Sequence, residues 1–276
     1  MHCYRHPNRE TYVSCSECGR GICPDCMVFG PVGIRCPDHA KSAAVAPRQR
    51  ARMTARRFSA PAGIVTRTLI GVNVAIYLLE LATGAPFNGS GGTIWEHGVL
   101  YGPVVANGDW WRLITAAFLH YGPIHLGMNM LALWIFGQAL EIELGPWRYL
   151  LLYLVSGLAG SAGALIVSPE AATVGASGAI FGLLGAALAV QRSMGINIWQ
   201  SGIMTILFIN LLFTFGVPGI SIGGHLGGLV GGLICGFIVY ELANRMQNPV
   251  LPIALCVAVG VACFYLAIVI ANANAI

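Results

Sequence analysis

The sequence predicts an all-α polytopic membrane protein that carries a small metal-binding domain at its N-terminus. Hydrophobic residues make up 56% of the 276 positions and charged residues only 9%, whereas about 25% of the residues in a soluble domain are charged. Apolar segments recur along the chain at the length of about 20 residues that crosses a bilayer core. Cysteines and histidines crowd the first forty residues. A membrane domain that follows a separate polar unit accounts for all three observations.

The N-terminal unit contains four Cys/His pairs, each with two residues between its members. The pairs are Cys3-x2-His6, Cys15-x2-Cys18, Cys23-x2-Cys26 and Cys36-x2-His39. Eight such ligands suit two tetrahedral zinc ions with no open position, which makes the metal structural rather than catalytic. A unit of this size cannot build an adequate apolar core, and metal supplies the missing folding free energy. We therefore expect residues 1–40 to form a zinc-binding domain.

The spacing in residues 3–39 resembles a B-box-type zinc finger. That family interleaves its ligands, which implies one zinc on Cys3, His6, Cys23 and Cys26 and a second on Cys15, Cys18, Cys36 and His39. Two sequential sites are the alternative, and the sequence alone does not exclude them. The residues do not identify a partner for this domain, so we expect either contact with another protein or self-association.

A linker and seven apolar segments follow. Residues 41–63 are rich in Ala, Pro and Arg and lack apolar periodicity, so we expect a flexible basic linker near anionic lipid headgroups. No signal peptide is visible at the polar N-terminus, so the first spanning helix would direct insertion. The predicted spans are 66–84, 121–140, 147–168, 176–194, 197–216, 220–243 and 250–271. Six of them form a core within 64–245, and the seventh lies within 246–276.

The basic residues predict the orientation of these spans. Of the 15 Lys and Arg residues, only Arg112 falls outside the N-terminal region and the alternate loops that share its side. Cytoplasmic loops collect Lys and Arg, so we expect a cytoplasmic N-terminus and an external C-terminus in the cell membrane. Their placement fits topology better than a basic patch for nucleic acid. The stretch 85–120 holds four aromatic residues (Trp95, Tyr101, Trp110 and Trp111) and is expected to lie on or dip into the bilayer surface.

Two polar residues in the apolar segments suggest chemistry. Ser177 begins the fourth span between Gly175 and Gly178, which permit close backbone approach. Alone, this serine is equally well explained as a helix cap. His225 lies in the sixth span, and a lone histidine there is otherwise a packing or proton-relay residue. Polar groups in a membrane are costly and often functional, and together these two fit a nucleophile and its base.

A glycine stripe gives a reason for the two residues to meet. Glycines recur every four residues on the sixth span, at Gly224, Gly228, Gly232 and Gly236. Such stripes allow close packing of membrane helices, and Gly178 with Gly182 supplies the matching face on the fourth span. Close packing would place Ser177 Oγ within hydrogen-bond reach of His225.

Three further residues complete the candidate site. Phe181 lies four residues after Ser177 on the same helix face and is expected to stack on His225, the alternative being an ordinary lipid-facing or core phenylalanine. His125 and Asn129 share one face of the second span, and both side chains can donate hydrogen bonds to an oxyanion. The alternative for this pair is interhelical hydrogen bonding. No acidic residue is placed to orient His225, so a Ser-His dyad fits better than a triad.

The chain from about 66 to 245 resembles the rhomboid intramembrane serine proteases. The resemblance rests on motifs in one order: Trp111-Arg112, His125-x3-Asn129, Glu141-x3-Gly145, Gly175-x-Ser177-Gly178 and His225-x2-Gly228-x3-Gly232. It implies a six-helix core with Ser177 as nucleophile, His225 as base, and His125, Asn129 and the Ser177 backbone N–H around the oxyanion. One departure is Gly224, where the family commonly has Ala. Residues 246–276 would add a helix after this core.

The resemblance also implies an activity. The expected function is an intramembrane serine endopeptidase that cuts transmembrane proteins near the outer membrane face and needs no cofactor for the chemistry. The substrate must unwind, because a helix shields its carbonyls in hydrogen bonds. The alternative is a non-catalytic rhomboid-like protein that binds transmembrane clients. A transporter or channel is disfavoured because the spans lack a paired-charge pathway.

Overall fold

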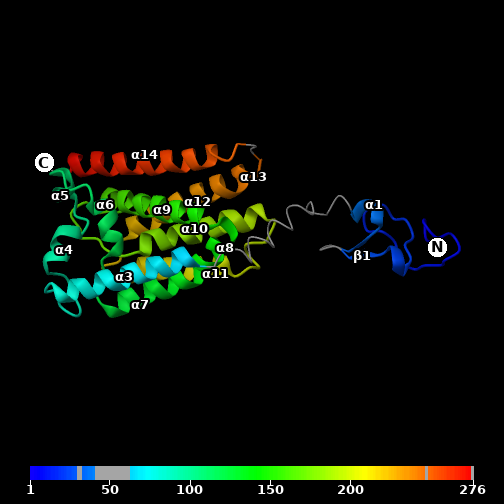
Figure 1. The fold of residues 1–276 in the computed structure, drawn as a ribbon, viewed down its shortest axis with the longest axis horizontal. Coiled ribbons are helices and arrows are strands. Elements are labelled where there is room, and N and C mark those ends of the chain that lie inside the picture. The colour runs from blue at the N-terminus through cyan, green and yellow to red at the C-terminus, as the bar shows by residue number, and fades with distance from the viewer. Residues whose placement is uncertain (30–32, 41–62, 246–247, 275–276) are drawn as a thin grey trace. The chain divides into compact units, whose positions relative to one another are not determined.

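The computed structural model of the chain describes residues 1–29, 33–40, 63–245 and 248–274. These residues form two compact units, one within 1–60 and the other within 61–276 (Figure 1). The predicted linker at 41–63 lies outside the described residues except for Gly63. The predicted domain boundaries at residues 40, 63 and 245 remain predictions.

The N-terminal unit has little regular structure. It contains a 3-10 turn η1 (Pro24–Cys26), an antiparallel hairpin of β1 (Val28–Phe29) and β2 (Ile34–Arg35), and a single helical turn α1 (Pro37–Ala40). Its buried apolar cluster consists of five cysteines and Ile22. One buried isoleucine cannot stabilise a fold against the loss of chain entropy, so the cysteines must contribute more than hydrophobic contact.

The membrane unit is helical throughout its described length apart from its connections. Each of the seven predicted segments forms a helix. Five of them are single helices: α3 (Ile64–Ala82), α9 (Pro146–Val167), α10 (Ser177–Ser193), α11 (Ile203–Gly216) and α14 (Leu251–Ala273). The second segment is a continuous helix made of α7 (Pro123–Ala132), the π-helical turn η3 (Leu133–Gly137) and α8 (Gln138–Leu144). The sixth is a continuous helix made of α12 (Ile222–Gly236), the π-helical η4 (Phe237–Leu242) and α13 (Ala243–Arg245). The all-α prediction is confirmed.

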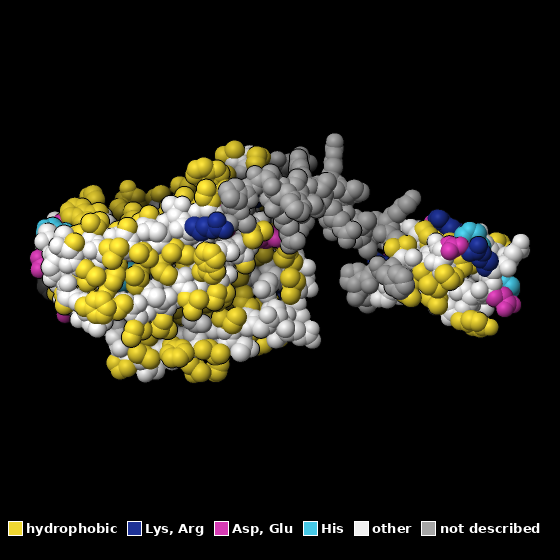
Figure 2. Space-filling model, turned by 60° about the horizontal axis from the view of Figure 1, so that its bottom comes forward, with side chains coloured by type: hydrophobic (Ala, Val, Ile, Leu, Met, Phe, Trp, Pro, Cys, Tyr) yellow, Lys and Arg dark blue, Asp and Glu magenta, His cyan; other side chains and the backbone are white. Residues whose placement is uncertain are grey.

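Four of these helices are long and apolar enough to cross a membrane: α3, α9, Ile222–Arg245 and α14. The apolar helix α11 has only 14 residues and α10 only 17, while the helix Pro123–Leu144 carries polar residues within its length. Figure 2 shows a surface of the membrane unit rich in hydrophobic side chains and poor in charged ones. This is the surface that a multi-pass membrane protein presents to lipid.

Helix α12 packs against both α10 and α9, and its glycines make the contacts. A Cβ atom built on Gly228 would lie 1.9 Å from the carbonyl oxygen of Gly178, and one on Gly232 equally close to that of Gly182. The predicted packing of the glycine stripe against the fourth span is therefore confirmed. A second stripe, absent from the prediction, faces α9, where a Cβ on Gly223 would lie 2.1 Å from the carbonyl oxygen of Gly163.

The connection between the first two spans forms short helices: α4 (Thr93–Gly98), α5 (Gly102–Ala106), α6 (Arg112–Thr115) and the 3-10 turn η2 (Ala116–Phe118). Trp110 and Trp111 are half exposed, as expected at a membrane surface. The expectation is wrong for Trp95, which is buried with Val99 and Leu119 and meets the ring of Tyr121 edge-on. Its apolar area stabilises the interior of the connection, a burial that composition alone did not indicate.

Candidate active site and metal clusters

Ser177 is the first residue of α10 and follows a backbone turn that only glycine adopts without strain. Gly175 has φ +118°, a conformation that L side chains rarely take. Its N–H donates to the carbonyl of Ala116 over 2.8 Å, and a Cβ atom there would lie 2.8 Å from the His125 ring. The turn thus presses the backbone against His125. The first N–H groups of a helix lack intrahelical acceptors, so this end of α10 offers free donors.

His225 on α12 lies in hydrogen-bond contact with Ser177. Its Nε2 is 2.8 Å from Ser177 Oγ, and its ring is 9% exposed. The ring of Phe181 stacks on it at a centroid distance of 4.1 Å with 17° between the planes. The second ring nitrogen, Nδ1, lies 2.7 Å from the hydroxyl oxygen of Thr214 on α11. Three helices therefore fix this imidazole.

His125 and Asn129 face the turn that precedes Ser177. A Cβ built on Gly175 would lie 2.9 Å from His125 Nε2 and 3.8 Å from Asn129 Nδ2. The Tyr121 backbone N–H donates to His125 Nδ1 over 3.3 Å, which assigns the ring proton to Nε2 and makes that nitrogen a donor. The Asn129 amide donates one hydrogen to the His125 carbonyl over 3.0 Å and keeps a second hydrogen for another acceptor.

A small cavity adjoins these groups. Its volume is about 30 Å³, and its lining includes Gly175, Ser177, Ser221 and His225. A cavity holds a water molecule when about 10–15 Å³ is available and polar partners are present. The cavity therefore has room for water beside the Ser177 hydroxyl.

Two buried charged side chains, Arg112 and Glu141, link the segments around the site through hydrogen bonds. The buried guanidinium of Arg112 donates to the carbonyls of Glu96 and Val99 and pairs with Asp109, which ties α4 to α6. The carboxylate of Glu141 accepts hydrogen bonds from the backbone N–H groups of Val65 and Thr66 and from the Thr66 hydroxyl. This carboxylate satisfies donors at the start of α3, where a negative charge is favoured.

Residues 107–242, which carry the serine, the histidine and their neighbours, match the family model of the rhomboid domain. The membrane unit belongs to the rhomboid family. The six spans of the rhomboid core are α3, α7–α8, α9, α10, α11 and α12–α13, and α14 is the added helix, which packs on α9. The predicted fold class, a six-helix rhomboid core with one added C-terminal helix, is thus confirmed.

Several bacterial and plant proteins share this domain. The chain is 39% identical over 164 residues to rhomboid protease GluP of Bacillus subtilis, covering 58% of this chain and 32% of that protein. It is 42% identical over 126 residues to the putative rhomboid protease YdcA of the same organism, covering 44% and 63% of the two chains. It is 47% identical over 105 residues to the mitochondrial RHOMBOID-like protein 6 of Arabidopsis thaliana, covering 37% and 34%. The chain therefore spans about a third of GluP and less than two thirds of YdcA.

Thr214 is the residue of the rhomboid domain that the sequence reading missed. It is eleven positions before His225 in an apolar helix, where a threonine commonly bonds back to its own helix. The available signal was weak: Asn210 and Thr214 are polar residues four apart, hence on one face of α11. Only the packing of α11 beside α12 shows that this face meets the His225 ring.

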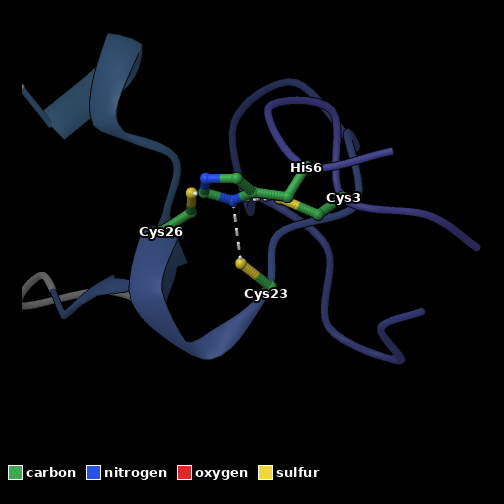
Figure 3. A group of neighbouring side chains, drawn as sticks. All are labelled: Cys3, His6, Cys23 and Cys26. Carbon is green, nitrogen blue, oxygen red and sulfur yellow. Dashed lines mark hydrogen bonds between the residues drawn. The ribbon is translucent and has the colours of Figure 1, made fainter. Parts of the chain in front are cut away.

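Outside the rhomboid domain, the eight predicted metal ligands form two groups of four. Cys3, His6, Cys23 and Cys26 make one, and Cys15, Cys18, Cys36 and His39 the other, with the ligand atoms of each group within 4.8 Å of one another. Figure 3 shows the first group converging from two segments of the unit. This is the interleaved arrangement, and the sequential alternative does not match it.

The distances within these groups fit a tetrahedral ion. His6 Nδ1 lies 3.3 Å from Cys23 Sγ and 3.4 Å from Cys26 Sγ, and Cys18 Sγ lies 3.9 Å from Cys36 Sγ. Zinc bonds of about 2.3 Å to sulfur and 2.0 Å to nitrogen place tetrahedral ligand atoms about 3.5–3.8 Å apart. The residues present therefore suit a metal of the zinc type.

Asp38 links the two metal-ligand groups. Its carboxylate accepts a hydrogen bond from the Tyr4 hydroxyl over 2.8 Å and pairs with Arg5. Tyr4 and Arg5 lie between Cys3 and His6 of the first group, while Asp38 precedes His39 of the second. The hydrogen bond from Tyr4, reinforced by the one from Arg5, holds the pKa of Asp38 below its ordinary value. The carboxylate is consequently charged at neutral pH and able to keep both contacts.

Proposed function

We propose that the chain is an intramembrane serine endopeptidase that cleaves transmembrane proteins through a dyad of Ser177 and His225. The observation that carries the proposal is the 2.8 Å contact between His225 Nε2 and Ser177 Oγ at the interface of two membrane helices. Membership of the rhomboid family and likeness to proteins named as proteases support it. In this reaction His225 takes the Ser177 proton as the hydroxyl attacks the scissile carbonyl, and then protonates the leaving amine.

The oxyanion would be held by three donors. His125 Nε2–H and the free hydrogen of the Asn129 amide face the turn before Ser177, and the Ser177 backbone N–H lies at a helix start. Fixed donors aimed at the developing charge are often the largest single contribution to such catalysis. Gly175 and Gly178 support the site by allowing this approach, and Phe181 supports the His225 ring by stacking. Water for the second half-reaction would occupy the cavity beside Ser177.

The substrate class follows from the location of the site. Ser177 begins a helix in a multi-pass membrane protein, so its substrates would be transmembrane segments that reach it through the lipid bilayer. The predicted orientation places cleavage near the outer face of the cell membrane. A substrate must lose helical hydrogen bonds at the cut before its carbonyl becomes available.

The test is cleavage of a model transmembrane substrate by the purified full chain in liposomes. Ser177→Ala and His225→Ala should each remove detectable cleavage, whereas Ser201→Ala, an exposed serine in the connection between α10 and α11, should cut as the parent does. A fluorophosphonate probe should add its mass to the parent and not to Ser177→Ala. Cleavage by either dyad variant at the parental rate would refute the dyad. Substrate binding without cleavage by the parent would favour the client-binding alternative.

For the N-terminal unit we propose two structural zinc ions, one in each group of three cysteines and one histidine. The bound metal would supply folding free energy to a unit that buries one isoleucine besides its cysteines. Metal analysis of the purified chain should give two zinc ions per chain, and fewer would contradict the proposal. Its partner would be a protein or a second copy of the chain.

A further inference from the structure

Thr214 is one of three buried residues on α11, together with Ile203 and Leu207. It lies near the end of α11 with 1% of its surface accessible, while Leu212, Phe213 and Phe215 around it are more than half exposed. Its hydroxyl oxygen is 2.8 Å from the Asn210 carbonyl and 2.7 Å from His225 Nδ1. This is the one side-chain hydrogen bond from α11 to another helix among the residues that the structure describes.

The two contacts define where the protons lie. A hydroxyl has a single hydrogen, and when Thr214 gives it to the Asn210 carbonyl, its oxygen accepts from His225 Nδ1–H. Nδ1 then carries the ring proton, and Nε2 presents a lone pair to the Ser177 hydroxyl. In the opposite assignment Nε2 carries the proton and cannot accept the one from Ser177. The bond of Thr214 back to its own helix therefore selects the tautomer that serves as a base.

We propose that Thr214 is the positioning residue of the base, which holds His225 in the Nδ1–H tautomer and fixes the ring toward Ser177. The inference rests on the proposed dyad. A carboxylate performs this task in a Ser-His-Asp triad, and here, among the described residues, no carboxylate hydrogen-bonds His225. A neutral acceptor avoids placing an ion in the bilayer, where charge is costly.

Because Thr214 belongs to α11, its hydrogen bond to His225 depends on the position of that helix. Ser177 and Phe181 come from α10 and His225 from α12, two helices locked together by glycines, whereas Thr214 comes from a helix with few buried residues. Separation of α11 from α12 breaks the bond to Nδ1 and leaves the ring with its stacking on Phe181 and its contact with Ser177, neither of which fixes the proton on Nδ1. The base is therefore fully oriented when α11 is in place.

The kinetic test compares Thr214→Val, which keeps the shape and removes the hydroxyl, with Thr214→Ser, which keeps the hydroxyl and removes the methyl group. In the full chain in liposomes, Thr214→Val should lower kcat about 10-fold, the worth of a neutral hydrogen bond at the site, with KM within about twofold. Thr214→Ser should recover kcat to within about threefold of the parent. The matched control is Thr205→Val, at an exposed position of the same helix, which should show the kinetics of the parent. Packing as the sole role predicts the reverse order of the Val and Ser variants and would overturn the proposal.

A spectroscopic test separates this inference from the proposed activity. Solid-state NMR of chain labelled with ¹⁵N-histidine distinguishes protonated from unprotonated ring nitrogens, and His225→Gln assigns the His225 signals by their loss. The parent should show protonated Nδ1 and unprotonated Nε2, and Thr214→Val a mixture of tautomers. A parent His225 with unprotonated Nδ1, or a tautomer unchanged in Thr214→Val, overturns the role of Thr214. Absence of cleavage by the parent refutes the proposed function while this measurement still decides the tautomer.

Discussion

The two side chains that face the turn at Gly175 are engaged to different extents. His125 accepts a hydrogen bond from the Tyr121 N–H at Nδ1, so its ring hydrogen is on Nε2 and is available for donation. The Asn129 amide donates one hydrogen to the His125 carbonyl of its own helix, and its second hydrogen remains available for another acceptor. Both groups are held in place before a substrate arrives, as electrostatic stabilisation of an oxyanion requires.

The first prediction concerns these donors. Asn129→Ala and His125→Ala should each lower kcat about 10- to 100-fold, because each removes one donor that acts on the charge of the transition state. KM should change little, since that charge is absent from the bound substrate. Steady-state cleavage in liposomes measures both constants, and Asn197→Ala, beyond the far end of α10, is the control. A rise in KM with unchanged kcat would assign both residues to substrate binding.

Sequence reasoning reached the residues whose chemistry is unusual in a bilayer. A serine between glycines, a histidine in an apolar helix and an Asn-His pair at helical spacing each stand out, and the structure brings all four side chains to one turn. Thr214 and Trp95 escaped because their types are ordinary where they occur. A threonine bonds to its own helix and a tryptophan suits the membrane surface, so only tertiary packing shows that one meets His225 and the other is buried.

At the scale of elements, α12 has glycines on two faces and packs closely against α10 with one and against α9 with the other. The stripe toward α10 was visible at a spacing of four residues. The stripe toward α9 uses the neighbouring positions Gly223 and Gly227, where a Cβ on Gly227 would lie 2.4 Å from the Ala159 carbonyl. Two adjacent stripes merge in the sequence into one glycine-rich run, so the run predicts close packing but not the number of helices that receive it.

Because α12 packs so closely against α10, adding a single methyl group at their contact should lower the stability of the protein markedly. Gly232→Ala places a Cβ 1.9 Å from the Gly182 carbonyl oxygen, so the helices must separate, and the free energy of unfolding should fall by about 1–3 kcal/mol. Gly71→Ala on α3 meets nothing within 4 Å and should be neutral or stabilising by up to about 1 kcal/mol. Reversible unfolding in mixed micelles compares the two variants. Equal stabilities for Gly232→Ala and Gly71→Ala would contradict the close approach of α12 to α10.

The metal groups predict a pattern of zinc loss that distinguishes the two ligand pairings. Cys3→Ser with Cys26→Ser damages one group of the interleaved arrangement, so one zinc ion should remain. Cys3→Ser with Cys15→Ser damages both groups, so none should remain. Metal analysis of the purified full-length variants gives the counts. Sequential pairing predicts the reverse, because Cys3 and Cys15 would then share a site while Cys3 and Cys26 would not.

At the scale of the whole molecule, the sequence predicted seven membrane helices, and the structure has a helix at each position. Four satisfy the length and apolarity of a span, and the others are shorter or more polar. Two of the three departures, α10 and the helix Pro123–Leu144, carry residues of the candidate site, namely Ser177, His125 and Asn129. The proposed dyad needs Ser177 at the start of a helix, where its backbone N–H is available, and polar groups beside it in the membrane domain. On this proposal, the helices that differ most from an ordinary apolar span are those that carry the chemistry, where sequence rules commonly fail.

The orientation of the molecule is the last prediction. The predicted topology puts Arg148, Arg192 and Arg245 on the same side of the membrane as the residues before α3. The excess of basic residues on that side predicts that it is cytoplasmic. Alkaline phosphatase needs disulfides that form only outside the cytoplasm, so fusions after Gly219 and Asn274 should be active and a fusion after Ile196 inactive. Green fluorescent protein at the same positions should give the opposite pattern and controls for expression. Activity after Ile196 alone would invert the protein and move Ser177 to the cytoplasmic side.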